Sequence, residues 1–321
     1  MSTLIDRARG VLLATAAGDA LGAGYEFGGP LEDGTAVLMK GGGAFHWAPG
    51  EWTDDTSMAV VIARELAAGH PLEDTATLDS ICAAWIDWAA SAPDVGNQTA
   101  AVLGGADSPT AAACRAAAAT LHARTGRTAG NGSLMRTAPV ALAYLRDGDE
   151  EALAQATAAV SALTHADPAA GEACALWCLG IRQAVREGTV DLPGAVARLR
   201  ELGLLTAERE RYWLDVLGEA EAKQPRDFEH NGWVVHALQG AWSAISHADS
   251  LRDALERAVR GGRDTDTVAA IAGGLAGALW GAAAVPDEWV EKVHGWPVVD
   301  GVATTGAQLV GMAEAIVERV A

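Results

Sequence analysis

Basic residues are scarce in this chain of 321 residues, which has 23 Lys and Arg against 42 Asp and Glu and a formal net charge of −19. Such an acidic chain should be soluble, and it lacks the broad basic surface that binds nucleic acid through phosphates. Any anionic ligand must therefore be held by local groups. Half of the residues are hydrophobic and 20% are charged, a balance that excludes intrinsic disorder.

Cysteines and aromatic residues are also few. Aromatics make up 5% of the chain, and the 11 tryptophans, which occur mostly in apolar helical segments, are expected in the core. The cysteines form no Cys-x-x-Cys pair and lie in apolar, alanine-rich stretches, so we expect buried reduced thiols and a cytoplasmic location. They are Cys82, Cys114, Cys174 and Cys178.

No segment is a convincing membrane span. The apolar run at 11–17 comes after two arginines and faintly resembles a signal peptide, but it is short and Asp19 interrupts the apolar residues beyond it. The uncharged segment Val268 to Val285 is built mostly of Ala and Gly, which favours a buried helix. Its glycines at 273, 277 and 281 recur every four residues and form a bare stripe, where another helix can approach closely.

The remaining pattern predicts a compact all-α fold. Ala, Leu, Glu and Arg dominate the long segments, Pro and Gly mark their ends, and no alternating run predicts a confident strand. No polar linker or internal repeat divides the chain, so we expect one domain over 1–321. Helices are expected at about 4–20, 55–69, 74–90, 97–103, 109–123, 133–146, 150–163, 168–188, 193–202, 206–222, 231–246, 250–259, 266–284 and 304–319.

Two apolar helices begin with paired Thr and Asp residues, at 53–56 and at 264–267. One interpretation is capping, with Thr53 at the first start and Asp266 or Thr267 at the second. A metal site is the alternative, because four polar residues in a row exceed what one cap needs. If the two starts meet, each pair of carboxylates about 4 Å apart costs about 4 kcal/mol, and two divalent cations would neutralise four carboxylates. Ligands that are all oxygen suit Mg²⁺, Mn²⁺ or Ca²⁺.

Three further motifs have both structural and functional interpretations. Gly18 to Gly22 (Gly-Asp-Ala-Leu-Gly), with Glu26 shortly after, reads as a helix end and a solvated loop. The segment Gly130 to Arg136 is a glycine turn before a predicted helix, which is common, although such turns also bind phosphate. Thr164 and His165 lie at a helix junction, where a lone histidine is more often structural than a ligand contact.

Taken in order, these motifs resemble those of the ADP-ribosylglycohydrolase family, over about residues 10 to 285. The resemblance implies a multi-helix orthogonal fold with a binuclear Mg²⁺ or Mn²⁺ centre in a cleft. Carried over by position, the implied metal ligands are Thr53, Asp54, Asp55, Asp264, Asp266 and Thr267. The implied proton-transfer groups are Glu26, on a loop that gates the site in relatives, and Asp55. The implied contacts to ADP-ribose are Gly96, Asn131, Gly132, Ser133, Met135, Arg136 and His165.

The implied activity is hydrolysis of the α-glycosidic bond between ADP-ribose and a modified protein side chain, with ADP-ribose released. One alternative keeps the cleft and changes the substrate to O-acetyl-ADP-ribose, ADP-ribose 1″-phosphate or nucleic-acid-linked ADP-ribose. Another is a family member without catalysis, either an ADP-ribose binder or a crystallin-like structural protein. The chain departs from some relatives at 166–168, where Ala-Asp-Pro stands in place of a second histidine, and Arg263 precedes the second acidic start.

Overall fold

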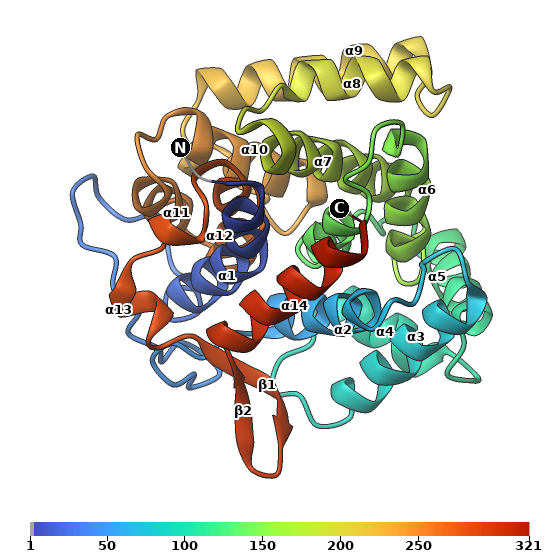
Figure 1. Cartoon of the computed structure of the whole chain (residues 1–321), viewed down its shortest axis with the longest axis horizontal. Coiled ribbons are helices and arrows are strands. Elements are labelled where there is room, and N and C mark those ends of the chain that lie inside the picture. Colours follow the sequence, from blue (N-terminus) through green and yellow to red (C-terminus); the bar gives the residue numbers. More distant parts are fainter. Residues whose placement is uncertain (1–2, 321) are drawn as a thin grey trace.

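Helices are the dominant elements of the computed structural model, which describes residues 3–320 (Figure 1). The predicted all-α fold is confirmed. The helices are α1 (Leu4–Gly22), α2 (Asp54–Ala68), α3 (Thr75–Ala89), α4 (Asn97–Gly105), α5 (Ala111–Thr125), α6 (Glu150–Ser161), α7 (Pro168–Glu187), α8 (Leu192–Glu201), α9 (Ala207–Ala222), α10 (Val234–Ser246), α11 (Leu251–Arg260), α12 (Thr265–Trp280), α13 (Asp287–Val290) and α14 (Gly306–Val320).

The centre of the molecule is the pair α1 and α12, which lie side by side although some 260 residues separate them (Figure 1). Glycines allow this approach. A Cβ at Gly273 would lie 2.1 Å from the carbonyl oxygen of Ala14, and one at Gly18 would lie 2.1 Å from that of Ala269. The predicted glycine stripe is therefore a helix contact at Gly273 and Gly277, while Gly281 ends the helix with φ 85°.

One predicted helix is wrong. The segment 133–146 forms two short 3-10 turns, Asn131–Ser133 and Ala138–Ala143, in place of a continuous α-helix. Pro139 stands in the first turn of the second one and supplies no backbone N–H. The residues from Leu134 to Leu142 are almost completely buried, so tertiary packing decides their conformation.

A small antiparallel sheet was also not expected from the sequence. Strands β1 (His294–Val299) and β2 (Val302–Thr305) form a hairpin that projects from the helices (Figure 1). The start of β1 packs against the core. Gly295 leaves room for the indole of Trp52, whose Nε1 donates a hydrogen bond to the Trp296 carbonyl oxygen at 3.0 Å.

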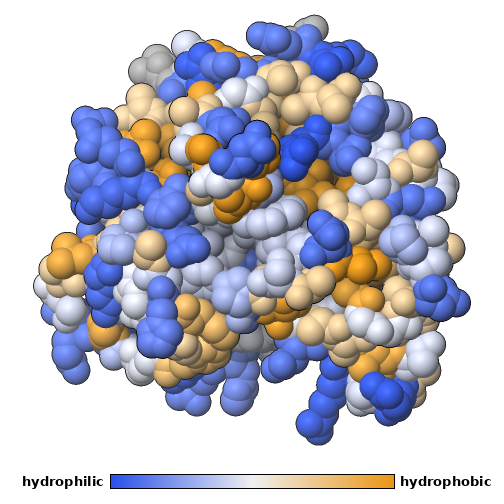
Figure 2. All heavy atoms as spheres, turned by 90° about the horizontal axis from the view of Figure 1, so that it is seen from below, coloured by the Kyte–Doolittle hydropathy of each residue, from blue (hydrophilic) through white to orange (hydrophobic). Residues whose placement is uncertain are grey.

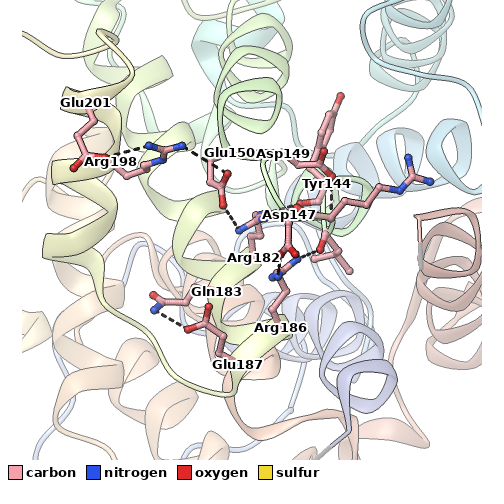
Figure 3. A network of polar contacts seen from close by, with 12 residues as sticks. Tyr144, Asp147, Asp149, Glu150, Arg182, Gln183, Arg186, Glu187, Arg198 and Glu201 are labelled. Atoms are coloured by element: carbon pink, nitrogen blue, oxygen red, sulfur yellow. Dashed lines mark hydrogen bonds and ion pairs between the residues drawn. The ribbon is translucent and has the colours of Figure 1, made fainter.

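Helix α7 is joined to α6 and α8 by a polar network (Figure 3). The Arg182 guanidinium forms a 2.8 Å ion pair with Glu150 at the start of α6, and its Nε donates to the Tyr144 carbonyl oxygen at 2.7 Å. These contacts hold the long loop before α6 against the core. They lie apart from the acidic helix starts and serve the fold.

The prediction that the cysteines and tryptophans are buried is confirmed at most positions. All four cysteines are buried and free, and Trp52, Trp85, Trp177 and Trp213 are among the largest fully buried side chains. Trp233 is 39% exposed, and Trp280 and Trp296 are half-buried. Between residues 3 and 320, no helix is both long and apolar enough to span a lipid bilayer.

Candidate active site

The two acidic helix starts converge. Carboxylate oxygens of Asp19, Asp55 and Asp266 lie within 4.8 Å of one another, and a second group at the same spacing joins Asp266 to Glu26 and Asp264. These residues come from α1, the loop after it, and the starts of α2 and α12. The close packing of α1 on α12 thus brings the two predicted clusters together.

The start of α2 is capped by a residue far away in the sequence. Thr53 stands at the N-cap position without a capping side-chain bond, so the capping interpretation of Thr53 is wrong. Asp19 caps the helix from α1 instead: its carboxylate accepts from the backbone N–H groups of Thr53 and Thr56, both at 2.9 Å. The Thr53 hydroxyl is consequently free to donate to Asp55 Oδ2 at 2.8 Å.

The start of α12 is held by two asparagines. Asn131 Nδ2 donates to Asp264 Oδ2 at 2.7 Å, and Asn231 Oδ1 accepts from the Asp264 backbone N–H at 3.2 Å. The guanidinium of Arg263 forms a hydrogen bond with the carbonyl oxygen of Arg226 and faces Glu229 at 3.6 Å, which directs it away from the acidic cluster. Its backbone pairs with Phe27 and Gly28, which ties the Glu26 loop to the start of α12.

Several of the clustered carboxylates are not neutralised by the protein. Asp55 Oδ1, Asp266 Oδ1 and Glu26 Oε2 are buried and have no hydrogen-bond partner within the described chain. Among residues 3–320, no Lys, Arg or His forms an ion pair with any carboxylate of the cluster. Buried, unpaired carboxylates are costly unless a cation compensates them.

The pKa values in this cluster reflect that cost. Burial, and after it repulsion from Asp94 and Asp19, raises the pKa of Asp54 to about 8. Burial and the repulsion of Asp264 raise the pKa of Glu26 to about 9. The pKa values of Asp55 and Asp266 also lie well above the usual range, chiefly because of burial. The cluster has the oxygen donors and the excess negative charge of a divalent-cation site.

A cleft of about 470 Å³ opens above the cluster. The acidic part of its lining, which we call the acidic end, consists of Glu26, Asp54, Asp94, Asp264 and Asp266, and the adjoining neutral part is called the neutral end. The neutral end is formed by the start of α4, the glycine turn before the first 3-10 turn, and the junction after α6. Its residues include Gly96, Gln98, Gly130, Asn131, Gly132, Met135 and His165.

At the neutral end, the glycine turn packs tightly on the histidine. A Cβ at Gly132 would lie 3.3 Å from His165 Cε1, closer than ordinary contact. The His165 ring is 3% exposed, and its Nδ1 lies 2.7 Å from Thr164 Oγ1. Burial and the nearby Arg136 hold the pKa of His165 well below its ordinary value, so the ring is neutral at physiological pH.

Arg136 lies behind the cleft, which corrects the expectation that it contacts a ligand. Its side chain is fully buried, its guanidinium stacks 4.1 Å over the Trp85 ring, and Nη2 donates to Thr164 Oγ1 at 2.7 Å. Ser133 is likewise fully buried and does not line the cleft. Both residues support the wall that carries Asn131 and His165.

The other predicted site residues fall into two layers. Asp54, Asp264, Asp266 and Thr267 line the cleft together with Glu26, while Thr53 and Asp55 are buried beneath it. Sequence reasoning assigned no role to Asp19, Asp94 or Asn231. A charged residue inside the apolar run of α1 is a signal that could have indicated Asp19, because a carboxylate is rarely buried without a task.

Known proteins are similar to this chain over most of its length. The sequence profile described as ADP-ribosylglycohydrolase matches residues 1–320. The chain belongs to the ADP-ribosylglycohydrolase family. A solved structure titled "ADP-ribosylglycohydrolase-related protein complex" superposes on this family member with a TM-score of 0.71 at 27% identity, covering 99% of both chains.

Two characterised relatives are similar over most of the chain. The ADP-ribosylarginine hydrolase Tri1 of Pseudomonas putida (strain GB-1) is 34% identical over 294 residues, which cover 90% of this glycohydrolase-family chain and 74% of the relative. The ADP-ribosyl-[dinitrogen reductase] glycohydrolase of Rhodospirillum rubrum is 31% identical over 303 residues, or 90% of each protein. The resemblance inferred from the sequence is confirmed.

Proposed function

We propose that this protein hydrolyses the glycosidic bond between ADP-ribose and a modified protein side chain, and that the side chain is arginine. The observation that carries the proposal is the convergence of two acidic helix starts beneath one cleft, with buried carboxylate oxygens that nothing in the described chain satisfies. The activities for which both relatives are named concern ADP-ribose attached to protein, and one names arginine.

The residues proposed to hold two divalent cations, Mg²⁺ or Mn²⁺, are those of the two helix starts. The partnerless oxygens of Asp55 and Asp266 fit such a group, and hard oxygen donors suit both ions. When bound, the cations supply positive charge that offsets the carboxylates and lowers the pKa of water towards neutrality. The full set comprises Thr53, Asp54, Asp55, Asp264, Asp266 and Thr267, and Asp19 positions its α2 half.

The acidic end of the cleft is where the reacting bond would lie. Glu26 lines the cleft, whereas Asp55 is fully buried beneath it, so we assign proton transfer at the leaving group or the attacking water to Glu26. Asp55 then remains below the floor of the cleft. The transition state has oxocarbenium character, as in other glycoside cleavages.

The neutral end would bind the diphosphate and the distal ribose. We infer that the Thr164 hydroxyl, which accepts from Arg136, donates to His165 Nδ1. The neutral ring then carries its proton on Nε2, which faces the glycine turn and provides a hydrogen-bond donor without introducing a charge. Binding at this end fixes the position of the sugar relative to Glu26. The binding energy accelerates the reaction to the extent that these contacts are also made in the transition state.

The test measures release of ADP-ribose from a protein modified on arginine, with and without EDTA and with added Mg²⁺ or Mn²⁺. Asp54→Ala and Asp266→Ala should each abolish turnover, while both variants should keep the helical circular dichroism of the native chain. Full activity in chelator, or in either variant, would exclude the proposed mechanism. Parallel assays with serine-linked and nucleic-acid-linked ADP-ribose and with O-acetyl-ADP-ribose identify the acceptor.

A further inference from the structure

A second cavity of about 200 Å³ lies beside the acidic end of the cleft, between the start of α2, the end of α3 and the base of the hairpin. Asp54 and Asp94 line both spaces, so the two carboxylates form a shared wall. The other lining residues are rich in tryptophan and include Trp47, Trp52, Trp88 and Trp296 together with Glu51. We call this space the tryptophan pocket.

Its lining is aromatic and acidic at the same time. The rings of Trp88 and Trp296 lie 6.3 Å apart and are inclined at 57°. Three carboxylates border the space, from Glu51, Asp54 and Asp94, and neither Lys nor Arg is found among its lining residues in the described chain. Faces of tryptophan attract cations, and Arg stacks on them more often than Lys does. The combination therefore favours a planar cation over a neutral or anionic group.

An aromatic row connects the tryptophan pocket with the cleft. Phe45 lines the cleft, Trp47 lines the pocket, and their ring centroids are 6.1 Å apart. Only 7% of Trp47 is exposed. Its indole Nε1 is buried and has no hydrogen-bond partner within residues 3–320. A buried donor without a partner is costly, and the cost falls when an oxygen atom of water or of a bound polypeptide accepts its hydrogen bond.

We propose that the tryptophan pocket receives the side chain of the acceptor arginine, which makes it the specificity pocket of the enzyme. The inference rests on the proposed function, in which the acceptor leaves from the acidic end of the cleft. There the guanidinium lies beside Asp94, at the boundary between the pocket and the cleft, and the aliphatic stem packs on Trp88 and Trp296. A neutral acceptor such as serine lacks the charge that this lining recognises.

On the face shown in Figure 2, hydrophobic residues form small separate groups between hydrophilic ones, so this face carries no broad flat apolar docking surface. The exposed valines of the hairpin, Val298 and Val302, are 55% and 68% exposed. Of these two, Val298 borders the pocket, where it adds an apolar edge beside the acidic wall.

The experiment is isothermal calorimetry of the full chain saturated with ADP-ribose and Mg²⁺, titrated with L-arginine and, separately, with L-citrulline. Citrulline has the same shape and lacks the charge, so arginine should bind at least about tenfold more tightly. Trp296→Leu should weaken arginine binding about tenfold, and Trp296→Tyr should restore most of it. Glu51→Gln should weaken arginine binding and leave citrulline binding unchanged. Trp280→Leu, at the far end of α12, is the matched control and should bind arginine as the native chain does.

Kinetics then separate this inference from the proposed function. If Trp296→Leu lowers kcat/KM for arginine-linked ADP-ribose and spares a serine-linked substrate, the specificity pocket is supported. Equal loss on both substrates, or equal binding of arginine and citrulline, overturns it while the glycohydrolase function stands. If the native chain releases ADP-ribose from no substrate, the proposed function fails, and calorimetry still decides whether the pocket selects a guanidinium.

Discussion

A single methyl group between α1 and α12 should disturb both stability and activity. In Gly18→Ala, the new Cβ would lie 2.1 Å from the carbonyl oxygen of Ala269, about 1.3 Å short of the 3.4 Å at which ordinary contact begins. Both partners are backbone atoms within central helices, so the helices must separate. Overpacking of this kind costs about 1–3 kcal/mol, and better helix propensity returns at most about 1 kcal/mol.

The displacement acts directly on the candidate site. Gly18 precedes Asp19, which caps α2, and Ala269 lies one turn after Asp266. A shift near 1 Å between these carboxylates should lower kcat/KM about 100-fold. Urea unfolding gives the free energy of unfolding, and ADP-ribose release gives the rate.

The matched control is Gly218→Ala in α9, where nothing lies within 4 Å of the new Cβ. This variant should be as active as the native chain and more stable by about 0.5–1 kcal/mol. If Gly18→Ala matched it in stability and rate, close approach of α1 and α12 would not be what assembles the site.

Three further predictions concern the charges. In EDTA, the free energy of unfolding should fall as pH rises from 6.5 to 8, because burial raises the pKa of Asp54 to about 8 and the folded state then holds a proton that the unfolded state has lost. Saturating Mg²⁺ should flatten or reverse this slope in urea titrations, and a rise in EDTA would contradict the reasoning. Asp19→Ala removes the cap of α2 and should cost about 2 kcal/mol in urea unfolding, with Asp249→Ala as an exposed comparison. Arg136→Met should weaken ADP-ribose binding measured by calorimetry through His165, and Arg124→Met, on the exposed end of α5, should not.

Much of the helical architecture could be predicted because it arises from local chemistry. Alanine-rich segments with Gly and Pro at their ends predicted α3 and α7 closely, and the glycine period predicted a close helix contact at Gly273. The prediction of a helix over 133–146 was wrong because distant contacts, and not local chemistry, decide the conformation of this segment. Its apolar residues are buried by neighbours far away in the sequence, and Pro139 removes a donor where a helix would need one.

The candidate site was predictable in its residues and less so in their arrangement. The paired Thr and Asp at two helix starts pointed to the cluster, but only the packing of α1 shows that Asp19 serves α2 as a cap. Arg136 comes after a glycine turn and reads as a phosphate contact, whereas its guanidinium stacks on Trp85, a residue 51 positions earlier. Side-chain partners that are distant along the chain cannot be found from spacing alone.

The pairing of α1 with α12 also determines how late in synthesis the acidic cluster can form. The ribosome synthesises α1 first, and its partner leaves the exit tunnel only after more than four fifths of the chain has been translated. Until then, the face of α1 that packs on α12 has no permanent cover. The acidic cluster consequently cannot close, or bind a cation through both of its halves, on a nascent chain: the hydrolase matures in one late step.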